Sequence, residues 1–496
     1  MSALVWFRND LRLLDNDAVL QACQNHQHVH FLVTPTLQHY VEHDWSLVKW
    51  DLYQRQLNQI GHDLADLGHI LLIHPLDKFA DCSAFLTDFC RAHQVAALYF
   101  NREYPLDEVN RDKAVITVLQ NNDVQVNTFA SNLLVAPEQI KNGKGEYYKV
   151  FTPFFKVWLQ RIRENGVPAP YARNILQAAS GRTLAFAEVH LSLPEYPTEL
   201  VPGLADSALT EPLQTSNEWP VGEANIRKLA QQFVREQSMD YKRQRDFPSI
   251  KGTSRLSAYF EIGALSPRVA AHLLQRLSPE FPDGLPEGSH TWLSELAWRE
   301  FYQHLMFHEP RLAKGEPFQA EQAKFPWRTD VERFAAWCNG KTGFPIVDAG
   351  MRELNNTGWM HNRVRMIVAS FLVKDLHINW QWGERYFMRR LIDGSFAANN
   401  GGWQWSAGTG TDAAPYFRVF NPTSQGEKFD PSGRYIRKFV QELADVPDKQ
   451  LHTPHQWLRQ ASLLDEATHS YPQQIVDHKD AREHFIATFK QVKNAE

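Results

Sequence analysis

The stretch that says most about this chain is LIDGSFAANNGGWQWSAGTGTDAAPYFRVFNPTSQGEKF, residues 391–429. It places Trp403 and Trp405 directly after two asparagines and two glycines. Nine of the fifteen tryptophans of the chain lie between Trp292 and Trp405. Because a buried indole N–H needs a hydrogen-bond partner, tryptophan is a demanding way to fill a core. One tryptophan alone is more often a core residue, but this cluster among polar residues indicates a functional site.

The composition limits the class of protein. At 496 residues the chain exceeds the roughly 250–300 residues at which a single core stops growing, so we expect more than one domain. Hydrophobic residues make up 43% and charged residues 22%, as in ordinary globular proteins. No apolar run approaches the roughly 20 residues of a membrane span, and no signal-peptide pattern opens the sequence. We therefore expect a cytoplasmic protein that does not enter a membrane.

Cysteine usage and charge narrow the class further. The four cysteines are scattered and form no C-x-x-C pair, so neither disulfides nor a zinc site is expected. The net charge of −5 argues against a generally basic surface for nucleic acid. DNA binding would need a local basic face, for which KRQR at 242–245 and RYIRK at 434–438 are candidates. Each run alone is usually a solvated helix face, so only their convergence on one site would count.

The first third of the chain alternates short apolar runs with amphipathic segments. The runs predict buried strands at 3–7, 28–34, 69–74, 97–101 and 124–129, and helical spacing occurs at 16–26, 46–67, 79–93 and 106–121. Strands that alternate with helices pair in parallel through right-handed crossovers, so this part predicts a doubly wound α/β domain with a parallel sheet. No G-x-G-x-x-G follows the first strand, which argues against a dinucleotide-binding Rossmann unit.

The remaining two thirds differ in pattern. Over 132–222 proline recurs among Ser, Thr, Gly and Ala, which predicts a long connector with one helix near 151–165. From residue 223 onward strand signals nearly vanish, and helical periodicity predicts an all-helical domain. The predicted organisation is an α/β domain at 1–131, a connector at 132–222, a helical domain at 223–485 and a tail at 486–496.

Several long motifs carry a family resemblance. They are VWFRNDLRLLDN at 5–16, TSRLS at 253–257, WLSELAWREFYQHL at 292–305, KTGFPIVDAGMRELNNTGWMHNRVRMIVASFL at 341–372 and NNGGWQW at 399–405. In this order and spacing they resemble the photolyase/cryptochrome family, and most of all its bacterial class I cyclobutane pyrimidine dimer photolyases. The resemblance covers nearly the whole chain. It implies that the α/β domain helps to hold a light-harvesting antenna and that the helical domain binds flavin adenine dinucleotide (FAD).

The resemblance assigns a set of FAD-binding residues. The cluster at 253–257 offers hydroxyls, an arginine and backbone N–H groups to an anion, although the same residues would also suit an ordinary helix N-cap. In the family this segment holds the FAD diphosphate. Arg365 matches an arginine that pairs with an aspartate, here Asp393, and a fixed cation there favours the anionic reduced flavin. The implied cofactor-binding residues are Tyr241, Thr253, Ser254, Arg255, Leu256, Ser257, Trp292, Arg299, Asp393, Gly394, Ser395 and Asn399. The implied catalytic residues are Glu295, Asn399, Arg365 and Asp393.

Ser395 departs from the family pattern. Relatives usually have Asp-Gly-Asp where this chain has Asp393, Gly394 and Ser395. A serine hydroxyl can accept a hydrogen bond but brings no charge. We therefore expect altered redox tuning of the flavin without loss of binding. Asn399 matches the position beside the reactive nitrogen of the central flavin ring.

A second set of residues matches positions that contact damaged DNA. Glu295 and Arg299 lie near one helix face, and an internal Glu–Arg pair is common in amphipathic helices. In the family Glu295 contacts the damaged bases, where a carboxylic acid can stabilise a developing base anion, and Trp298 stacks on the flipped dimer. Asn362 with Met366 favours dimer repair over repair of (6-4) photoproducts. The implied DNA-binding residues are Arg245, Glu295, Trp298, Tyr302, Asn362, Arg363, Met366, Trp405, Arg418 and Gln425.

Two more sets follow from the resemblance. The tryptophans Trp403, Trp380 and Trp327 match an electron relay that runs from the flavin to the surface. The residues His43, Asp107, Glu108 and Lys314 match positions that bind a 5,10-methenyltetrahydrofolate antenna, although the usual residue at position 107 is Asn. A deazaflavin is the other choice of antenna.

The resemblance implies one main function. It is light-driven repair of cyclobutane pyrimidine dimers in DNA, by electron transfer from excited reduced FAD to the flipped-out dimer, in a monomeric carbon–carbon lyase. The alternative is a cryptochrome-type blue-light photoreceptor with little or no repair activity, because fold alone does not settle function. Glu295, Trp298, Asn362 and Met366 favour repair. A flavoprotein oxidoreductase would need a hydride-donor site that no motif provides.

Overall fold

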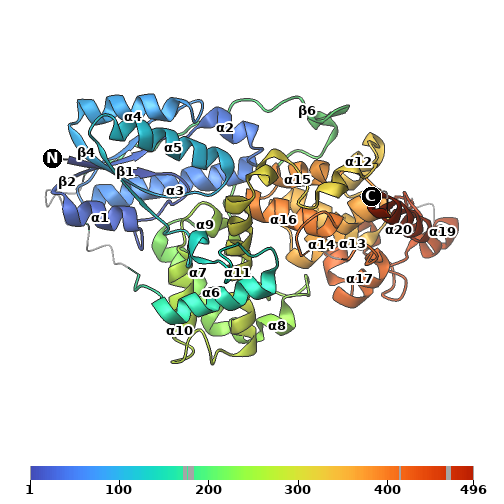
Figure 1. Ribbon diagram of the computed structural model, residues 1–496. Coiled ribbons are helices and arrows are strands. Elements are labelled where there is room, and N and C mark those ends of the chain that lie inside the picture. Colours follow the sequence, from blue (N-terminus) through green and yellow to red (C-terminus); the bar gives the residue numbers. More distant parts are fainter. Residues whose placement is uncertain (1, 171–175, 177–183, 413–414, 465–470, 495–496) are drawn as a thin grey trace.

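The computed structural model describes residues 2–170, 176, 184–412, 415–464 and 471–494 (Figure 1). Some positions of the predicted α/β domain, connector, helical domain and tail lie outside the described residues. They are 1, 171–175, 177–183, 413–414, 465–470 and 495–496. Within the described chain no helix combines the length and the apolar character needed to cross a membrane.

A five-stranded parallel sheet forms the first domain and confirms the predicted doubly wound α/β class. The strands are β1 (Ser2–Phe7), β2 (His28–Val33), β3 (Leu71–Ile73), β4 (Val95–Asn101) and β5 (Gln125–Phe129), in the spatial order β3-β2-β1-β4-β5. The helices are α1 (Asp17–Asn25), α2 (Leu37–Glu42), α3 (Leu47–Asp66), α4 (Asp81–Ala92) and α5 (Leu106–Gln120). Figure 1 shows α4 and α5 on one face of the sheet and α1 and α3 on the other. The short helix α2 was not predicted.

The central strand β1 explains why both faces are covered. Ala3, Val5 and Phe7 belong to one core, which includes residues of α1 and α3. Leu4 and Trp6 belong to another, which includes residues of α4 and α5. Successive side chains of a strand point to opposite faces, so a strand that is apolar throughout requires helices on both sides.

The segment between the two domains holds one helix and one small hairpin. Helix α6 (Phe151–Asn165) is the helix predicted near 151–165. Strand β6 (Glu199–Val201) pairs antiparallel with β7 (Leu204–Ala205), and this hairpin was not predicted. Strands this short contain too few residues for period-two alternation to show.

From Glu223 onward the described chain forms helices and no strands, as predicted. The α-helices are α7 (Glu223–Glu236), α8 (Tyr241–Gln244), α9 (Ser257–Glu261), α10 (Pro267–Gln275), α11 (Glu287–His308), α12 (Val331–Cys338), α13 (Pro345–Thr357), α14 (Asn362–Ser370), α15 (Trp380–Met388), α16 (Phe396–Ala407), α17 (Pro422–Phe429), α18 (Arg434–Phe439), α19 (His455–Leu464) and α20 (His478–Asn494). One helix was expected over 360–375, but α14 passes into a π-helical turn, η7 (Phe371–Asp375). Helix α20 runs through the boundary predicted at residue 485.

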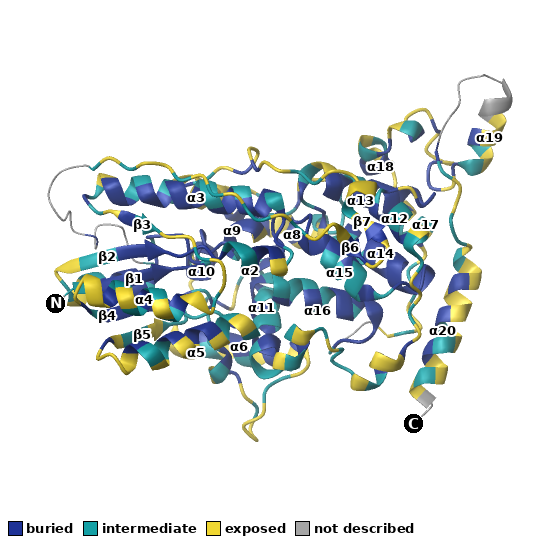
Figure 2. Cartoon of the chain, turned by 90° about the horizontal axis from the view of Figure 1, so that it is seen from above, coloured by how far each residue is buried: buried dark blue, intermediate teal, exposed yellow. Residues whose placement is uncertain are grey.

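Helix α11 is the longest helix of the described chain and lies near its centre (Figure 1). It contacts α6, α8 and α16. Its buried residues include Trp292, Leu293, Ala297, Phe301 and Leu305, and Figure 2 shows much of it buried or half-buried. A helix enclosed in this way is a rigid support for any side chain that it turns toward a cavity.

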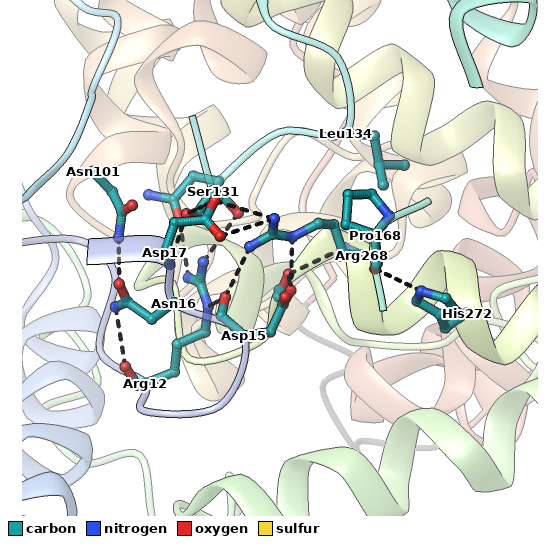
Figure 3. Close-up of polar contacts among 12 residues, drawn as sticks. Arg12, Asp15, Asn16, Asp17, Asn101, Ser131, Leu134, Pro168, Arg268 and His272 are labelled. Carbon is teal, nitrogen blue, oxygen red and sulfur yellow. Dashed lines mark hydrogen bonds and ion pairs between the residues drawn. The ribbon is translucent and has the colours of Figure 1, made fainter. Parts of the chain in front are cut away.

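A buried ion network joins the two domains (Figure 3). Arg268 of α10 pairs with Asp15 at 3.0 Å and with Asp17 at 3.1 Å. Arg12 donates a hydrogen bond to the carbonyl of Gly263 at 2.8 Å. Burial raises the pKa of the Asp15 carboxyl, and the nearby Arg268 and Arg12 oppose this shift. The motif at 5–16 therefore serves as the joint between the domains.

Candidate active site

A cavity of about 360 Å³ lies where α11, α14 and α16 meet the turn before α16. Twelve residues predicted from separate motifs line it, namely Arg245, Glu295, Trp298, Tyr302, Asn362, Arg365, Met366, Asp393, Ser395, Asn399, Trp403 and Trp405. The other lining residues are Ala369, Phe387, Leu391, Ala398, Gly402 and Ser406. The second group was missed because small and apolar residues carry no chemical signal of their own.

Arg365 and Asp393 form a polar edge of the cavity. The Nη2 atom of Arg365 lies 3.0 Å from each carboxylate oxygen of Asp393. The hydroxyl of Ser257 donates to Asp393 at 2.6 Å, and Nε of Arg365 donates to the carbonyl of Met360 at 2.8 Å. The guanidinium is therefore held from two sides and presents a fixed positive charge to the cavity.

Asn399 is held by a chain of amide and carboxyl contacts. Its Nδ2 donates to the backbone carbonyl of Glu384 at 2.9 Å. Asn400 donates to the Glu384 carboxyl at 2.9 Å and in turn accepts from Gln404 at 2.9 Å. Removal of the Glu384 carboxyl from water raises its pKa to about 7. Glu384 was not predicted, and its only sequence signal is its position one helical turn after Trp380.

The turn at 391–395 is held by α3 of the first domain. The hydroxyl of Ser46 donates to the carbonyl of Leu391 at 2.7 Å, and Nζ of Lys49 donates to the carbonyl of Gly394 at 2.9 Å. No sequence signal points to either contact, because each joins residues 345 positions apart. The geometry of this cavity wall therefore depends on how the two domains meet.

The segment at 253–257 turns sharply before α9. Arg255 has a φ of +52°, which a non-glycine residue rarely adopts. Its guanidinium lies 4.9 Å from the ring centre of Trp219 and 4.7 Å from that of Trp359. Leu256 is buried beneath it. The hydroxyl-bearing residues Thr253, Ser254 and Ser257 are all at least partly exposed, so the turn offers donors to an anion.

Three more of the predicted cofactor residues lie on α8 and α11 and do not line the 360 Å³ cavity. Tyr241 is buried at the start of α8. Trp292 is buried on α11 and packs against Phe233 with ring centres 5.0 Å apart. Arg299 donates to the carbonyl of Asn132 at 2.9 Å and lines a different, interdomain cavity.

Glu295 and Arg245 form an ion pair inside the larger cavity. Burial raises the pKa of Glu295, and the positive charge of Arg245 opposes this shift. Trp298 stacks on Phe151 of α6 with ring centres 3.7 Å apart and planes 7° apart. The Tyr302 ring leaves no room for a side chain at Gly401, so α11 and α16 meet closely there. The cavity thus combines a titratable acid with flat aromatic walls.

Two predicted DNA-binding arginines, Arg363 and Arg418, do not line the cavity. Arg363 donates to Asp246 at 2.8 Å, and its guanidinium lies 4.5 Å from the ring centre of Phe429. Arg418 is exposed in the segment before α17, and Gln425 lies on α17. Neither Arg418 nor Gln425 lines the cavity, so the structure separates them from the residues that do.

The three relay tryptophans differ in exposure. Trp403 is buried and lines the cavity. Gly383 of α15 lies directly against its ring, because a Cβ there would come within 2.1 Å of it. Trp380, on the same helix, is buried, whereas Trp327 is half-buried against Phe325 with ring centres 4.2 Å apart. Their exposure therefore increases from the cavity toward the surface.

The predicted antenna residues are only partly brought together. His43 and Glu108 line an interdomain cavity of about 80 Å³, together with Ser395, which also lines the larger cavity. His43 Nε2 lies 3.2 Å from a carboxylate oxygen of Asp107. Burial raises the pKa of Glu108 to about 8. Asp107 and Lys314 are not lining residues.

Comparison with known proteins relates both parts of the chain to one family. Residues 3–172 match the family described as DNA photolyase, and residues 292–491 match the FAD binding domain of DNA photolyase. The chain is 44% identical over 489 residues to the deoxyribodipyrimidine photo-lyase of Escherichia coli K12, with 98% of each chain covered.

Two solved structures share the fold. The class III photolyase of Agrobacterium tumefaciens superposes with a TM-score of 0.80 at 33% identity, covering 99% of this chain and 98% of that one. The cryptochrome of Synechocystis sp. PCC6803 superposes with a TM-score of 0.80 at 25% identity, covering 98% of this chain and 99% of that one.

Proposed function

The chain belongs to the DNA photolyase family, and we propose from this premise that it is a light-driven lyase that repairs cyclobutane pyrimidine dimers in DNA. One observation carries the proposal: Glu295, Trp298 and Met366 share a single cavity with Arg365, Asp393 and Asn399. The first group suits a pair of bases and the second suits a flavin ring. The cavity would therefore hold lesion and cofactor side by side.

The residues present fit FAD as the cofactor. The cavity of about 360 Å³ has the size of a ligand site, which is roughly 300–1,000 Å³. Asn399 uses its Nδ2 on Glu384, which leaves its Oδ1 as an acceptor for a ring N–H. The hydroxyls at 253–257 suit the diphosphate. When bound, FAD supplies the light absorption and the electron that opens the cyclobutane ring.

The residues on the side of the cavity assigned to the lesion would hold the dimer and supply a proton to it. Enzymes that act on a base within a duplex extrude it into a pocket. Trp298 and Trp405 give flat walls against which extruded bases can stack. Burial raises the pKa of Glu295, which favours uptake of a proton that the carboxyl could donate to a pyrimidine carbonyl. Arg245 then remains close enough to balance charge that develops there.

Two supporting devices complete the proposal. Trp403, Trp380 and Trp327 carry electrons from the surface to the cofactor, which their increasing exposure supports. The interdomain cavity with His43 and Glu108 suits a folate-type antenna, with a deazaflavin as the alternative. We further propose that the protein is a monomer. We also propose a cytoplasmic location, because the four free thiols of the described chain suit a reducing compartment.

The proposal is tested by a repair assay. Purified protein, chemically reduced and lit with near-ultraviolet or blue light, should restore thymines in an oligonucleotide that contains a cyclobutane dimer. Dark activity, or repair of (6-4) lesions alone, would contradict it. The fold is shared with a cryptochrome, so light-dependent flavin chemistry without any repair would instead favour a photoreceptor.

Glu295→Ala separates lesion chemistry from cofactor binding. Repair yield per absorbed photon should fall, because the proton donor to the pyrimidine is lost, while FAD content measured by absorbance stays at the wild-type level. Glu332→Ala, at an exposed position on α12, is the matched control and should change neither quantity. Unchanged repair yield in Glu295→Ala would remove this carboxyl from the mechanism.

A further inference from the structure

The buried ring of Trp403 contacts a tryptophan that the relay does not include. Trp337 of α12 lies against it in a T-shaped arrangement, with ring centres 6.1 Å apart and planes 71° apart. Trp337 is fully buried, and its indole N–H donates to the carbonyl of Val368 at 3.0 Å. A core tryptophan therefore touches the first member of the relay directly.

The aromatic contacts continue from Trp337 toward the surface. Phe334, one helical turn earlier on α12, stacks on Trp337 with ring centres 5.8 Å apart and planes 15° apart. Trp382 of α15 then lies against Phe334 with ring centres 5.2 Å apart. Unlike Trp337, Trp382 is half-buried. The packed path thus begins at the cavity and ends at an indole that reaches solvent.

This path leaves the cavity separately from the one that leads to Trp327. Trp380 and Trp382 are both on α15, but residues two apart on a helix do not face the same way. Trp382 packs against α12 through Phe334. Trp327 packs with Phe325 and with Phe485 and Phe489 of α20, and like Trp382 it also packs against the main core of the helical domain. The two half-buried indoles therefore have different aromatic neighbours, Phe325 for Trp327 and Phe334 for Trp382.

We propose that Trp337 and Trp382 form a second electron-entry branch to the cofactor, with Phe334 as the packed spacer between them. This inference rests on the proposed function, in which oxidised FAD is reloaded by tryptophans. Indoles are oxidised far more readily than a phenyl ring, so Phe334 carries no charge of its own and only fills the gap. Trp382 is the point at which external electrons enter this branch.

The electron balance of the branch is simple. One electron leaves Trp403 for the light-excited cofactor, and Trp337 returns one electron to Trp403. Trp382 then returns one electron to Trp337 and is left oxidised by one electron. Its indole N–H loses a proton to water, and a soluble thiol restores Trp382 by giving up one electron and one proton. The net change is one electron gained by the cofactor, one thiol oxidised to a thiyl radical and one proton released to water.

Burial gives the branch its direction. A cation radical on Trp337 is disfavoured because the ring is removed from water. Its indole N–H donates a hydrogen bond to the carbonyl of Val368, but a backbone carbonyl is too weak a base to take up the proton. Trp382 reaches water, which both solvates the cation and accepts its proton. Tyr386 also lies against Trp337, but its hydroxyl donates to Asn355 and Cys338 oxygens. Neither of these oxygens takes up a proton, so the charge moves on to Trp382.

The test compares photoreduction of oxidised holoprotein in the presence of a thiol. Trp327→Phe should leave a residual rate, and Trp327→Phe combined with Trp382→Phe should abolish it. Trp327→Phe combined with Trp382→Tyr should restore the residual rate, because tyrosine is oxidisable and differs from phenylalanine by one hydroxyl. Equal rates in the Trp382→Phe and Trp382→Tyr double variants, or no residual rate in Trp327→Phe alone, would overturn the branch.

A second readout locates the charge without relying on the reaction rate. Holoprotein illuminated in oxygen without thiol should acquire oxidation products at Trp382, identified by peptide mass spectrometry, and illuminated apoprotein should not. Absence of these products at Trp382 in the Trp327→Phe variant would contradict the proposal. Repair by chemically reduced wild-type protein is scored separately, so failure of the lyase activity and failure of the branch give different results.

Discussion

At the scale of single residues, the site depends on a few charges whose partners are fixed. Arg365 is held by Asp393 and by the carbonyl of Met360, so its positive charge stays at the cavity wall. Ser395, which also lines the cavity, brings no charge to this wall. A carboxylate introduced at Ser395 would therefore add a new negative charge to the wall of the cavity.

Ser395→Asp should lower the reduction potential of the bound flavin. A carboxylate at the cavity wall disfavours the anionic reduced ring by simple electrostatics. Redox titration of wild type and variant in one buffer measures the shift. Ser395→Asn, which has the same shape as the aspartate without its charge, should stay near the wild-type potential. A raised or unchanged potential in Ser395→Asp would show that this side chain does not face the ring.

Glu384→Gln should flatten the pH dependence of stability. The folded-state pKa of Glu384 is about 7, against an ordinary value of 4.5. Between these values the folded protein keeps a proton that the unfolded chain has lost. This group's contribution to stability is therefore complete below 4.5 and is lost as pH rises through 7, at up to about 1.4 kcal/mol per pH unit.

The measurement is urea unfolding between pH 5 and 8. Glutamine keeps the oxygen that accepts from Asn400 but cannot ionise, so the fall in unfolding free energy with pH should be smaller in the variant. The buried Glu300 also has a pKa of about 7 and should leave a remaining slope in both proteins. Identical slopes would mean that Glu384 titrates near its ordinary value.

At the scale of elements, α11, α14 and α16 line the cavity together with the turn before α16, and caps and turns fix how these helices begin and end. His361 caps α14, since its ring nitrogen accepts from the backbone N–H of Arg363. The π-helical turn η7 that follows α14 presents Asp375 to His478 at the start of α20. Such caps and turns aim side chains in directions that a continuous helix would not allow.

Arg363→Ala and Arg418→Ala should each weaken binding of dimer-containing DNA and flatten its salt dependence. Each arginine that contacts a phosphate contributes about one unit to the log–log salt slope. Binding isotherms at several salt concentrations give both the affinity and the slope. Arg91→Ala, at an exposed position on α4 of the first domain, is the control and should change neither. Salt-independent binding would contradict a phosphate-led interface.

At the scale of the whole molecule, the two domains act as one support for the cavity. Contacts from α3 fix the turn at 391–395, and the network around Arg268 locks the first domain onto α10 (Figure 3). The chain carries a formal net charge of −5 at pH 7. DNA must therefore be held by local cations near the cavity, against a repulsive background.

Arg268→Ala should destabilise the protein by about 3–5 kcal/mol, because it leaves the buried carboxylate of Asp15 without its partner. The thermal unfolding midpoint should fall accordingly. Arg276→Ala, at the exposed end of the same helix α10, should have little effect. A small change in Arg268→Ala would show that Asp15 is adequately compensated by Arg12 and Ser266.

The amino-acid sequence by itself determined what depends on local pattern. Short apolar runs alternating with helical spacing predicted all five strands of the sheet, and the family resemblance implied twelve residues that line the main cavity. The hairpin β6–β7 and the π-helical turn η7 were not predicted, because they are too short to produce a periodic pattern in the sequence.

Only the tertiary structure decided which of these residues meet. It brought Ser46 to Leu391, Glu384 to Asn399 and Trp382 to the path from Trp403, and it left Lys314 outside the interdomain cavity. The raised pKa of Glu384 arises in the same way. The physical reason is that periodicity is a property of neighbouring residues, whereas desolvation and contact across hundreds of positions exist only once distant segments pack together.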